Sequence, residues 1–255
     1  MRSLRNGVLG LFAVVFLLFL SYLVVGSMAT EWRFPALFPN GYTFHRWEAV
    51  LNRTEWALAL FYSFLLSAFV SLTCTSIGLL TASGLSRDPL STLWLRLCYL
   101  PYGLSPVLYA YSMQFFYHTT GMAGTWFGVY LAQFILVYPF AVVLFFNYFD
   151  EKMHNLEDIA ASLGASRWVR LKTVTLPVLR QPLQTVFAQL FLVSWFDYGI
   201  TSVIGTGQVK TLTLFVYQYI GESDLYYSAL ASCLLIAPPL FLWLFHRTFA
   251  LKPSK

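Results

Sequence analysis

The chain has 255 residues, of which 58% are hydrophobic and only 11% carry a charge, and its mean hydropathy is +0.64. So little polar surface cannot cover a water-soluble globule of this size, which excludes an ordinary soluble protein. The solvent around the chain must be largely lipid. Because a bilayer satisfies backbone groups only within helices or closed barrels, the sequence predicts an all-α, polytopic membrane protein.

Six segments are long and apolar enough to cross a bilayer as helices, which takes about 20 residues each. The predicted spans cover residues 8–28, 57–82, 94–116, 126–148, 183–204 and 226–245. The third span contains Pro101 and Pro106, so we expect a kinked helix there. We predict a single transmembrane domain over residues 1–255, with a polar loop at residues 149–182 between the fourth and fifth spans.

The first span begins like a cleavable secretory signal, because Arg2 and Arg5 precede an apolar run. That run of about 18 residues exceeds the roughly 7 to 15 of a signal peptide. We therefore expect an uncleaved membrane anchor.

Lysine and arginine predict the orientation, since cytoplasmic loops of membrane proteins hold most of them. With the N-terminus inside, twelve lie on the inner side: Arg2, Arg5, Arg87, Arg96, Lys152, Arg167, Arg170, Lys172, Arg180, Arg247, Lys252 and Lys255. Four lie on the outer side: Arg33, Arg46, Arg53 and Lys210. This bias predicts that both termini and the loop 149–182 are cytoplasmic.

Metal, cofactor and nucleic-acid sites are not predicted. The cysteines Cys74, Cys98 and Cys233 lie within apolar segments without a paired spacing, and the four histidines are scattered along the chain. No segment has the spacing of a phosphate-binding loop, so we expect no nucleotide site and no catalytic residue in this chain.

The loop 149–182 has the pattern of two short helices joined at a glycine. Asn155 can cap the first helix, and Glu157 and Asp158 then lie in its first turn, where the helix dipole favours negative charge. Gly164 can end it in the left-handed conformation. The small apolar face of this helix comprises Ile159, Ala160 and Leu163.

The second helix of the loop is predicted to begin after Ser166 as its cap and to run through about Thr175, with Pro177 stopping it. Its apolar face comprises Trp168, Leu171 and Val174. The loop could be a plain connection between two spans. However, small residues let another backbone approach closely, and they cluster here at Ala160, Ala161, Gly164 and Ala165. We therefore interpret the loop as a docking element for a cytoplasmic partner, bound as a helix in a groove.

These residues resemble the EAA loop of the permease subunits of bacterial ATP-binding-cassette (ABC) importers. That pattern has an acidic-Ala-Ala start, a glycine at a fixed distance and Ile-x-Leu-Pro further on. The matching positions here are Asp158, Ala160, Gly164 and Leu176-Pro177, while Ile159 replaces the first alanine and Val174 the isoleucine. Both departures are apolar, so they alter the packing of the docking face more than its character.

The resemblance implies a six-span permease subunit in the bacterial inner membrane that is itself no enzyme. It would pair with a second permease, identical or homologous, and receive two cytoplasmic ATPase subunits and an external substrate-binding protein. The EAA helix would couple ATP hydrolysis to alternating access by rigid movement. The coupling residues implied are Glu157, Asp158, Ile159, Ala160, Leu163 and Gly164.

Asp197 is the ionisable residue that lies well inside a predicted span. One interpretation is a structural carboxylate hydrogen-bonded to a neighbouring helix. The other is a pathway residue which, with Trp195 and Tyr109, would suit a small organic cation through charge pairing and cation–π contact. Both interpretations stay open.

The region around Asp197 is also similar to permeases of the group that includes polyamine, thiamine, ferric iron and phosphonate importers. The similar positions are Ser194, Asp197, Gly199, Thr201, Gly207 and residues 211–214. Polyamine permeases tend to have two acidic residues where this chain has Phe196-Asp197. This difference weakens the prediction of a polyamine as the substrate.

The sequence does not favour two other classes of membrane protein. A membrane-embedded enzyme would need catalytic side chains clustered at one membrane face, whereas the acidic residues here are dispersed or lie in the EAA helix. A secondary transporter or channel without an ATPase partner would need internal repeats and paired broken helices, which the sequence does not indicate.

Overall fold

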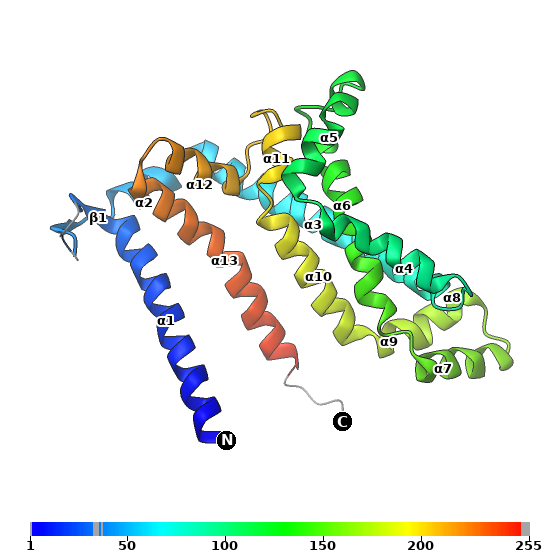
Figure 1. The fold of residues 1–255 in the computed structure, drawn as a ribbon. Helices are drawn as coiled ribbons and strands as arrows, with labels where there is room; N and C mark the ends of the chain where they lie inside the picture. Colours follow the sequence, from blue (N-terminus) through cyan, green and yellow to red (C-terminus); the bar gives the residue numbers. More distant parts are fainter. Residues whose placement is uncertain (1, 33–35, 37, 251–255) are drawn as a thin grey trace. The chain divides into compact units, whose positions relative to one another are not determined.

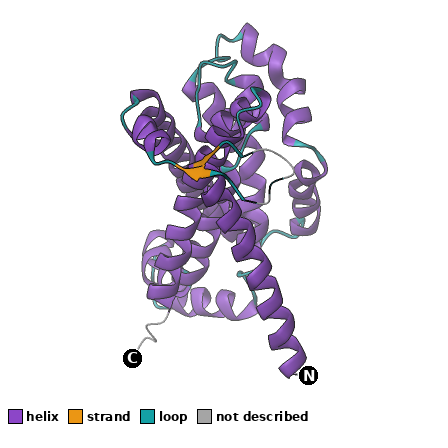
Figure 2. Cartoon of the chain, turned by 90° about the vertical axis from the view of Figure 1, so that its left-hand side faces the viewer, coloured by secondary structure: helices purple, strands orange, loops and turns teal. Residues whose placement is uncertain are grey.

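The computed structural model describes residues 2–32, 36 and 38–250. The described residues are almost entirely helical, and one antiparallel pair of two-residue strands joins β1 (Ala29–Thr30) to β2 (Gly41–Tyr42), drawn in orange in Figure 2. Three charges used for the orientation, at Arg33, Lys252 and Lys255, lie outside the described residues.

The chain forms two compact units. The terminal unit comprises Met1–Phe61 and Lys210–Phe241, and the central unit comprises Tyr62–Val209 and Leu242–Lys255. Elements of the terminal unit are α1 (Arg2–Met28), β1, β2, α2 (His45–Leu51), α12 (Leu212–Gly221) and most of α13 (Leu225–Ala250). The central unit holds most of α3 (Thr54–Leu85), then α4 (Ser91–Tyr99), η1 (Leu100–Gly103), α5 (Pro106–Thr119), α6 (Trp126–Phe146), α7 (Glu151–Ser162), α8 (Arg167–Arg170), η2 (Leu171–Thr175), α9 (Leu176–Val178), α10 (Arg180–Trp195) and α11 (Gly199–Ile204). The single domain over 1–255 stays a prediction.

Among the described residues, three helices are long and apolar enough to cross a membrane: Gly10–Met28 within α1, α3 and α6. They coincide with the predicted first, second and fourth spans. The predicted sixth span is also one continuous helix, α13, whose shorter apolar part is Leu225–Leu240.

The predicted third span is a broken helix, so the prediction of a continuous kinked helix was wrong. After α4 the chain forms the 3-10 turn η1, and Leu104 and Ser105 are then extended before α5 begins at Pro106. The residue before a proline is disfavoured in the α conformation, which explains the extended backbone at Ser105.

The predicted fifth span is also interrupted, between the end of α10 at Trp195 and the start of α11 at Gly199. The Asp197 side chain accepts hydrogen bonds from the backbone amides of Ile200 and Thr201, at 3.3 and 3.0 Å. Free amides at a helix start need such acceptors, so Asp197 stabilises the start of α11.

Within the central unit, α6 packs beside α10, as Figure 1 shows, and also contacts α4 and α11. The small residues Gly78 of α3 and Ala141 of α6 lie face to face and let these two helices approach closely. The hydroxyls of Thr81 and Tyr138 form a hydrogen bond of 2.8 Å between the same helices. Apolar packing and polar contacts therefore join α3 to α6.

In the terminal unit, an aromatic cluster joins the start of α3 to α12 and α13. Trp56 is 3% exposed and stacks on Tyr219, with the ring centroids 5.5 Å apart. Tyr219 in turn stacks on Tyr227 at 5.3 Å. Such aromatic contacts bury large apolar areas and hold the three segments together.

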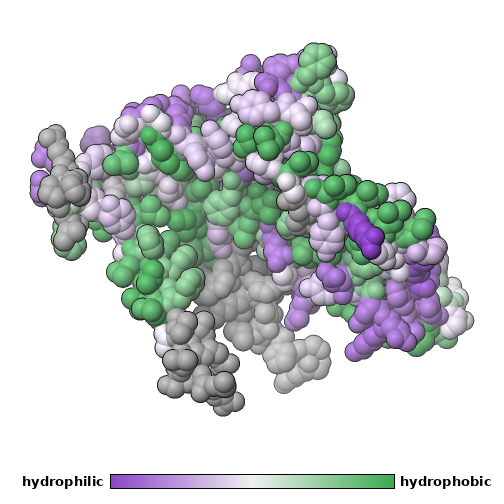
Figure 3. All heavy atoms as spheres, viewed as in Figure 1, coloured by the Kyte–Doolittle hydropathy of each residue, from purple (hydrophilic) through white to green (hydrophobic). Residues whose placement is uncertain are grey.

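The outer surface of several helices is apolar. Figure 3 shows hydrophobic side chains over much of the visible face, while hydrophilic ones gather at the lower right, where Figure 1 draws α7 and α8. Along α1, large apolar side chains from Leu11 to Phe19 are mostly exposed. Contact of such a surface with lipid is favourable, whereas contact with water is unfavourable.

Candidate functional site

The loop between α6 and α10 consists of α7, α8, the π-helical turn η2 and α9. Two helical parts joined at Gly164 agree with the sequence prediction. α7, however, begins at Glu151, because Asp150 accepts a hydrogen bond of 2.9 Å from the Met153 amide. The predicted cap at Asn155 was therefore wrong, and Glu157 and Asp158 lie beyond the first turn of the helix.

Gly164 ends the first helical part in the left-handed conformation, with φ +81°, as predicted. Its amide donates to the Ala161 carbonyl at 2.9 Å, and the Ala165 amide donates to the Ala160 carbonyl at 3.1 Å. Apart from the adjoining residues, no atom of the described chain lies within 4 Å of the position that a Cβ would take. The backbone conformation thus favours glycine here, and the space beside it is open.

Ser166 caps the second helical part, as predicted, since its hydroxyl accepts from the Val169 amide at 3.5 Å. The helix does not stop at Pro177 but continues through Val178. Pro177 lies in the first turn of α9, directly after the π turn, where a missing N–H group is tolerated best. The predicted stop was therefore wrong.

The face of the loop that packs against the rest of the central unit is buried and partly polar. Met153 and Glu157 of α7 are 2% and 7% exposed, and Thr175 at the end of η2 is 1% exposed. The Thr175 hydroxyl donates a hydrogen bond of 2.9 Å to Oε1 of Glu157. Leu171 and Val174 pack against the apolar core of the central unit. This face holds α7 and η2 together.

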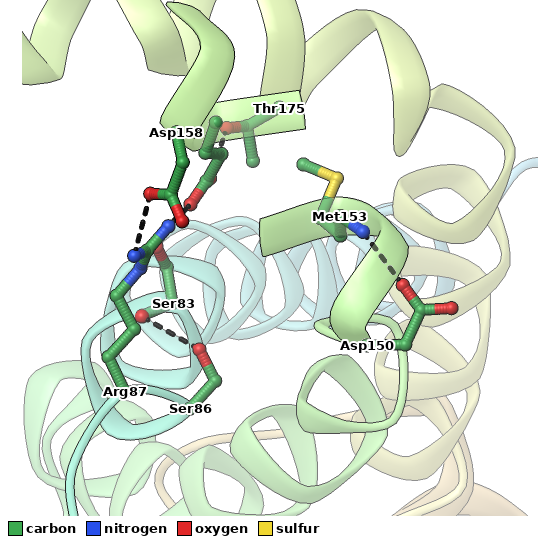
Figure 4. A network of polar contacts seen from close by, with 8 residues as sticks. Ser83, Ser86, Arg87, Asp150, Met153, Asp158 and Thr175 are labelled. Carbon is green, nitrogen blue, oxygen red and sulfur yellow. Dashed lines mark hydrogen bonds and ion pairs between the residues drawn. The ribbon is translucent and has the colours of Figure 1, made fainter. Parts of the chain in front are cut away.

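Arg87, two residues after the end of α3, forms ion pairs with two neighbouring acidic residues of α7, Glu157 and Asp158. Its guanidinium lies 3.2 Å from Glu157 Oε2 and 2.9 Å from Asp158 Oδ1. Figure 4 shows this guanidinium beside Asp158, with Thr175 close by. Burial lowers the pKa of Arg87, but its hydrogen bonds to Asp158 and Glu157 outweigh burial and raise the pKa above its ordinary value. Sequence analysis used Arg87 only as an inner-side charge and missed this contact.

The outer face of the loop presents apolar side chains. Ile159 and Leu163, one helical turn apart, are 59% and 83% exposed, whereas Ala160 is half-buried. Trp168 is exposed, whereas Leu171 and Val174 are partly buried. The three residues therefore do not form the single apolar face that the sequence predicted. Exposed apolar side chains such as Ile159, Leu163 and Trp168 on a loop are typical of a binding surface.

Asp197 is the centre of a second polar cluster, between α6, α10 and α11. Its Oδ2 atom accepts hydrogen bonds from Gln133 Nε2 at 3.0 Å and from the Thr201 hydroxyl at 2.8 Å. Gln133 also accepts a hydrogen bond from the Ser194 hydroxyl. Each carboxylate oxygen therefore has a donor, which is what the structural interpretation of Asp197 requires.

A cavity of about 270 Å³ lies beside this cluster, lined by Gln133, Ser194 and Asp197 together with apolar residues of α5, α6 and α10. The breaks in the predicted third and fifth spans meet at this cavity, since both Pro106 and Gly199 line it. The other two predicted pathway residues are both buried: Trp195 stacks on Phe191, and Tyr109 lies on α5. Neither is among the described residues that line the cavity.

Long apolar helices, a polar helical loop with exposed apolar side chains, and polar residues at broken spans define a membrane-embedded subunit of a transport system. Residues 75–250 match the family of the binding-protein-dependent transport system inner membrane component. The chain belongs to this family, so it is a multi-pass permease of a bacterial ABC transporter. ATP hydrolysis resides in partner subunits. Membership excludes the alternatives of a membrane enzyme and of a secondary transporter without an ATPase.

Individual relatives agree with this family. The 2-aminoethylphosphonate transport system permease PhnV of Salmonella typhimurium is 27% identical over 236 residues, covering 91% of this chain and 88% of the relative. The thiamine transport system permease ThiP of Escherichia coli is 30% identical over 88 residues, covering 34% of this chain and 16% of ThiP. A crystal structure of a bacterial ABC transporter for alginate import has a chain with a TM-score of 0.74 at 16% identity, with 96% of this chain and 95% of that chain covered. That likeness shows a shared fold.

Proposed function

We propose that this permease forms half of an importer's translocation pathway and that the loop 149–182 is its contact with an ATPase subunit. The observation that carries this proposal is the exposed pair Ile159 and Leu163 directly before Gly164. Trp168, which is 68% exposed, adds further apolar surface to the loop, but Ile159 and Leu163 are the exposed pair that lies directly before the left-handed turn. A groove on a partner would remove them from water, with a gain of about 1.5–3 kcal/mol for each fully buried side chain.

The open space beside Gly164 supports docking at the same surface of the loop. The space beside it is empty in this chain, so a partner backbone can approach α7 closely there. Asp158, whose side chain is 57% exposed, lies next to the apolar pair, and its ion pair with Arg87 offsets its charge. A matching groove would therefore be mainly apolar.

The proposed topology has six crossings with both termini in the cytoplasm. The bias of lysine and arginine toward the inner side supports it. The third and fifth crossings would each be interrupted, and broken helices are tolerated in a bilayer where protein covers the free backbone groups. Contacts between α5 and α11 supply such cover.

We infer that the working complex contains two ATPase subunits, a second permease and a substrate-binding protein. One loop of this kind per permease suits one ATPase subunit each. The family's description as binding-protein-dependent supports the external partner.

For the substrate we infer a small organic solute that carries an amine. The relative that covers 91% of the chain is named for 2-aminoethylphosphonate, which contains a primary amine. The Asp197 carboxylate and the cavity beside it support a pathway role for that residue. Uptake of labelled 2-aminoethylphosphonate by cells with the complete transporter tests this inference, and absence of uptake would remove this substrate.

The docking proposal is tested by co-purifying the tagged chain from mild detergent with its ATPase subunit. Two variants form a matched pair, because Gly164→Asn keeps the left-handed turn and Gly164→Arg blocks the open space beside it. We expect the wild type and the Asn variant to retain the ATPase subunit and the Arg variant to lose it. All three should be inserted in equal amounts. Retention of the ATPase by the Arg variant would exclude this surface.

A further inference from the structure

We propose that Arg87, Glu157 and Thr175 form a latch that makes the docking loop move together with α3. This inference rests on the proposed docking of the loop and assigns positioning residues that act through α7. Arg87 pairs with two acidic residues of α7, of which Glu157 is buried and Asp158 is 57% exposed.

The latch begins at the end of α3. Hydrogen bonds continue beyond the last helical residue, because the Ser86 amide donates to the Ala82 carbonyl at 2.9 Å and the Asp88 amide donates to the Leu85 carbonyl at 3.0 Å. Arg87 lies between these two amides in sequence. Its backbone neighbours are therefore hydrogen-bonded to the last turn of α3, and its side chain reaches α7.

Glu157 is the centre of the latch. Its side chain is 9% exposed, against 57% for the side chain of Asp158. Oε2 pairs with Arg87 at 3.2 Å, and Oε1 accepts from Thr175 at 2.9 Å. A buried carboxylate is costly unless its oxygens are paired, so loss of either partner weakens the contact with the other element.

The π turn η2 supplies the third component. A π-helical turn contains one residue more than an α-helical turn, and such turns are frequent at functional sites. Thr175 is the last residue of η2 and is buried with its hydroxyl on Glu157. Glu157 thus joins three segments that are far apart in sequence: the end of α3, α7 and the second half of the loop.

The latch affects how a movement of the loop is transmitted to the helices of the central unit. Covalent connections link the loop to α6 and α10 through residues 147–150 and 179. The latch adds a link to α3, which packs against α6 at Gly78. A push on the outer face of α7 therefore reaches three helices of the central unit together.

The test measures substrate uptake per ATP hydrolysed in the assembled transporter for Arg87→Gln, Glu157→Gln and the double variant. We expect each single variant to keep its ATPase subunit and to lose uptake per ATP by about threefold to thirtyfold. The double variant should lose less than the sum of the two single losses, because both variants remove the Arg87–Glu157 pair, while Arg87–Asp158 remains in Glu157→Gln. Arg87→Lys should restore part of the loss.

Two controls separate a latch from a general effect of charge or stability. Arg96→Gln removes the same charge from α4, and no ion pair is found for Arg96 in the part of the chain that the structure describes. We expect it to leave the uptake ratio unchanged. Thr175→Val removes one hydrogen bond at almost constant volume, so it should lower the ratio even if Glu157→Gln unfolds the chain.

Unchanged uptake per ATP in the latch variants, with the ATPase retained, would overturn the latch and leave the docking proposal intact. Additive losses in the double variant would also overturn it. Failure of the wild type itself to retain an ATPase subunit would instead remove the docking proposal.

Discussion

Gly78 of α3 faces Ala141 of α6 so closely that a Cβ atom added to Gly78 would stand 2.5 Å from the Ala141 Cβ atom. The Ala141 backbone carbonyl carbon would be 3.2 Å away. Neither atom can move without shifting a helix. Glycine at this position therefore determines how closely the two helices pack.

Gly78→Ala is expected to lower stability in detergent by about 1–3 kcal/mol, since overpacking forces the backbone to shift. Thermal unfolding of the purified chain measures this loss. Adding Ala141→Gly should recover part of it, because the nearest clash disappears while the backbone contact stays. Gly84→Ala on the same helix is the control, where no atom lies within 4 Å. Equal stability of the two alanine variants would contradict the close approach.

Gly199→Ala should disturb the junction of the two broken spans. The added Cβ would lie 2.8 Å from Val107 Cγ2 and 2.9 Å from the Val107 backbone nitrogen. We expect a loss of about 1–3 kcal/mol in thermal unfolding, which Val107→Ala relieves only in part because the backbone contact remains. Gly103→Ala, where the space is open, should have little effect. Full relief by Val107→Ala would show that the backbones are not in contact.

Asp197→Asn should destabilise the start of α11. The new amide group would face donors at Gln133 and Thr201 that the carboxylate now satisfies, at an expected cost of about 1–3 kcal/mol. Thermal unfolding and uptake are measured on the same variant. A loss of stability supports the structural interpretation of this carboxylate. A loss of uptake at unchanged stability would favour the pathway interpretation instead.

Leu163→Ala, at the C-cap of α7, and Met153→Ala, within α7, should have different effects because the first side chain is exposed and the second is buried. Leu163 is 83% exposed, so its variant should keep the stability of the chain and weaken ATPase retention in a pull-down. Met153 is 2% exposed, and its loss should cost about 2–5 kcal/mol of stability. Loss of stability in the Leu163 variant would mean that this side chain packs within the chain.

Sequence alone predicted the features that depend on local chemistry. Apolar runs identified the long helices α1, α3 and α6, and the need for a left-handed residue identified Gly164. Helix boundaries were harder to predict where two residues can each act as the N-cap. Asp150 and Asn155 can both cap a helix, and the intervening residues fit a helix equally well, so no local pattern chooses between them.

The remaining features depend on contacts between distant segments. Arg87 and Glu157 are 70 positions apart, and neither has a neighbour in sequence that indicates the other. The broken third span shows a different limit. Prolines predict a disturbance of a helix, but whether the helix kinks or breaks depends on what packs against the freed backbone.

The extra residue in η2 gives the second half of the loop a particular sensitivity to length. Removing one residue from Leu171–Thr175 without any other change of hydrogen-bond pattern would shift the helical register of this segment. The residues before the deletion would then rotate by about 100° relative to those after it. Members of this family that are one residue shorter in this segment would need another donor for the acidic residue at the position of Glu157.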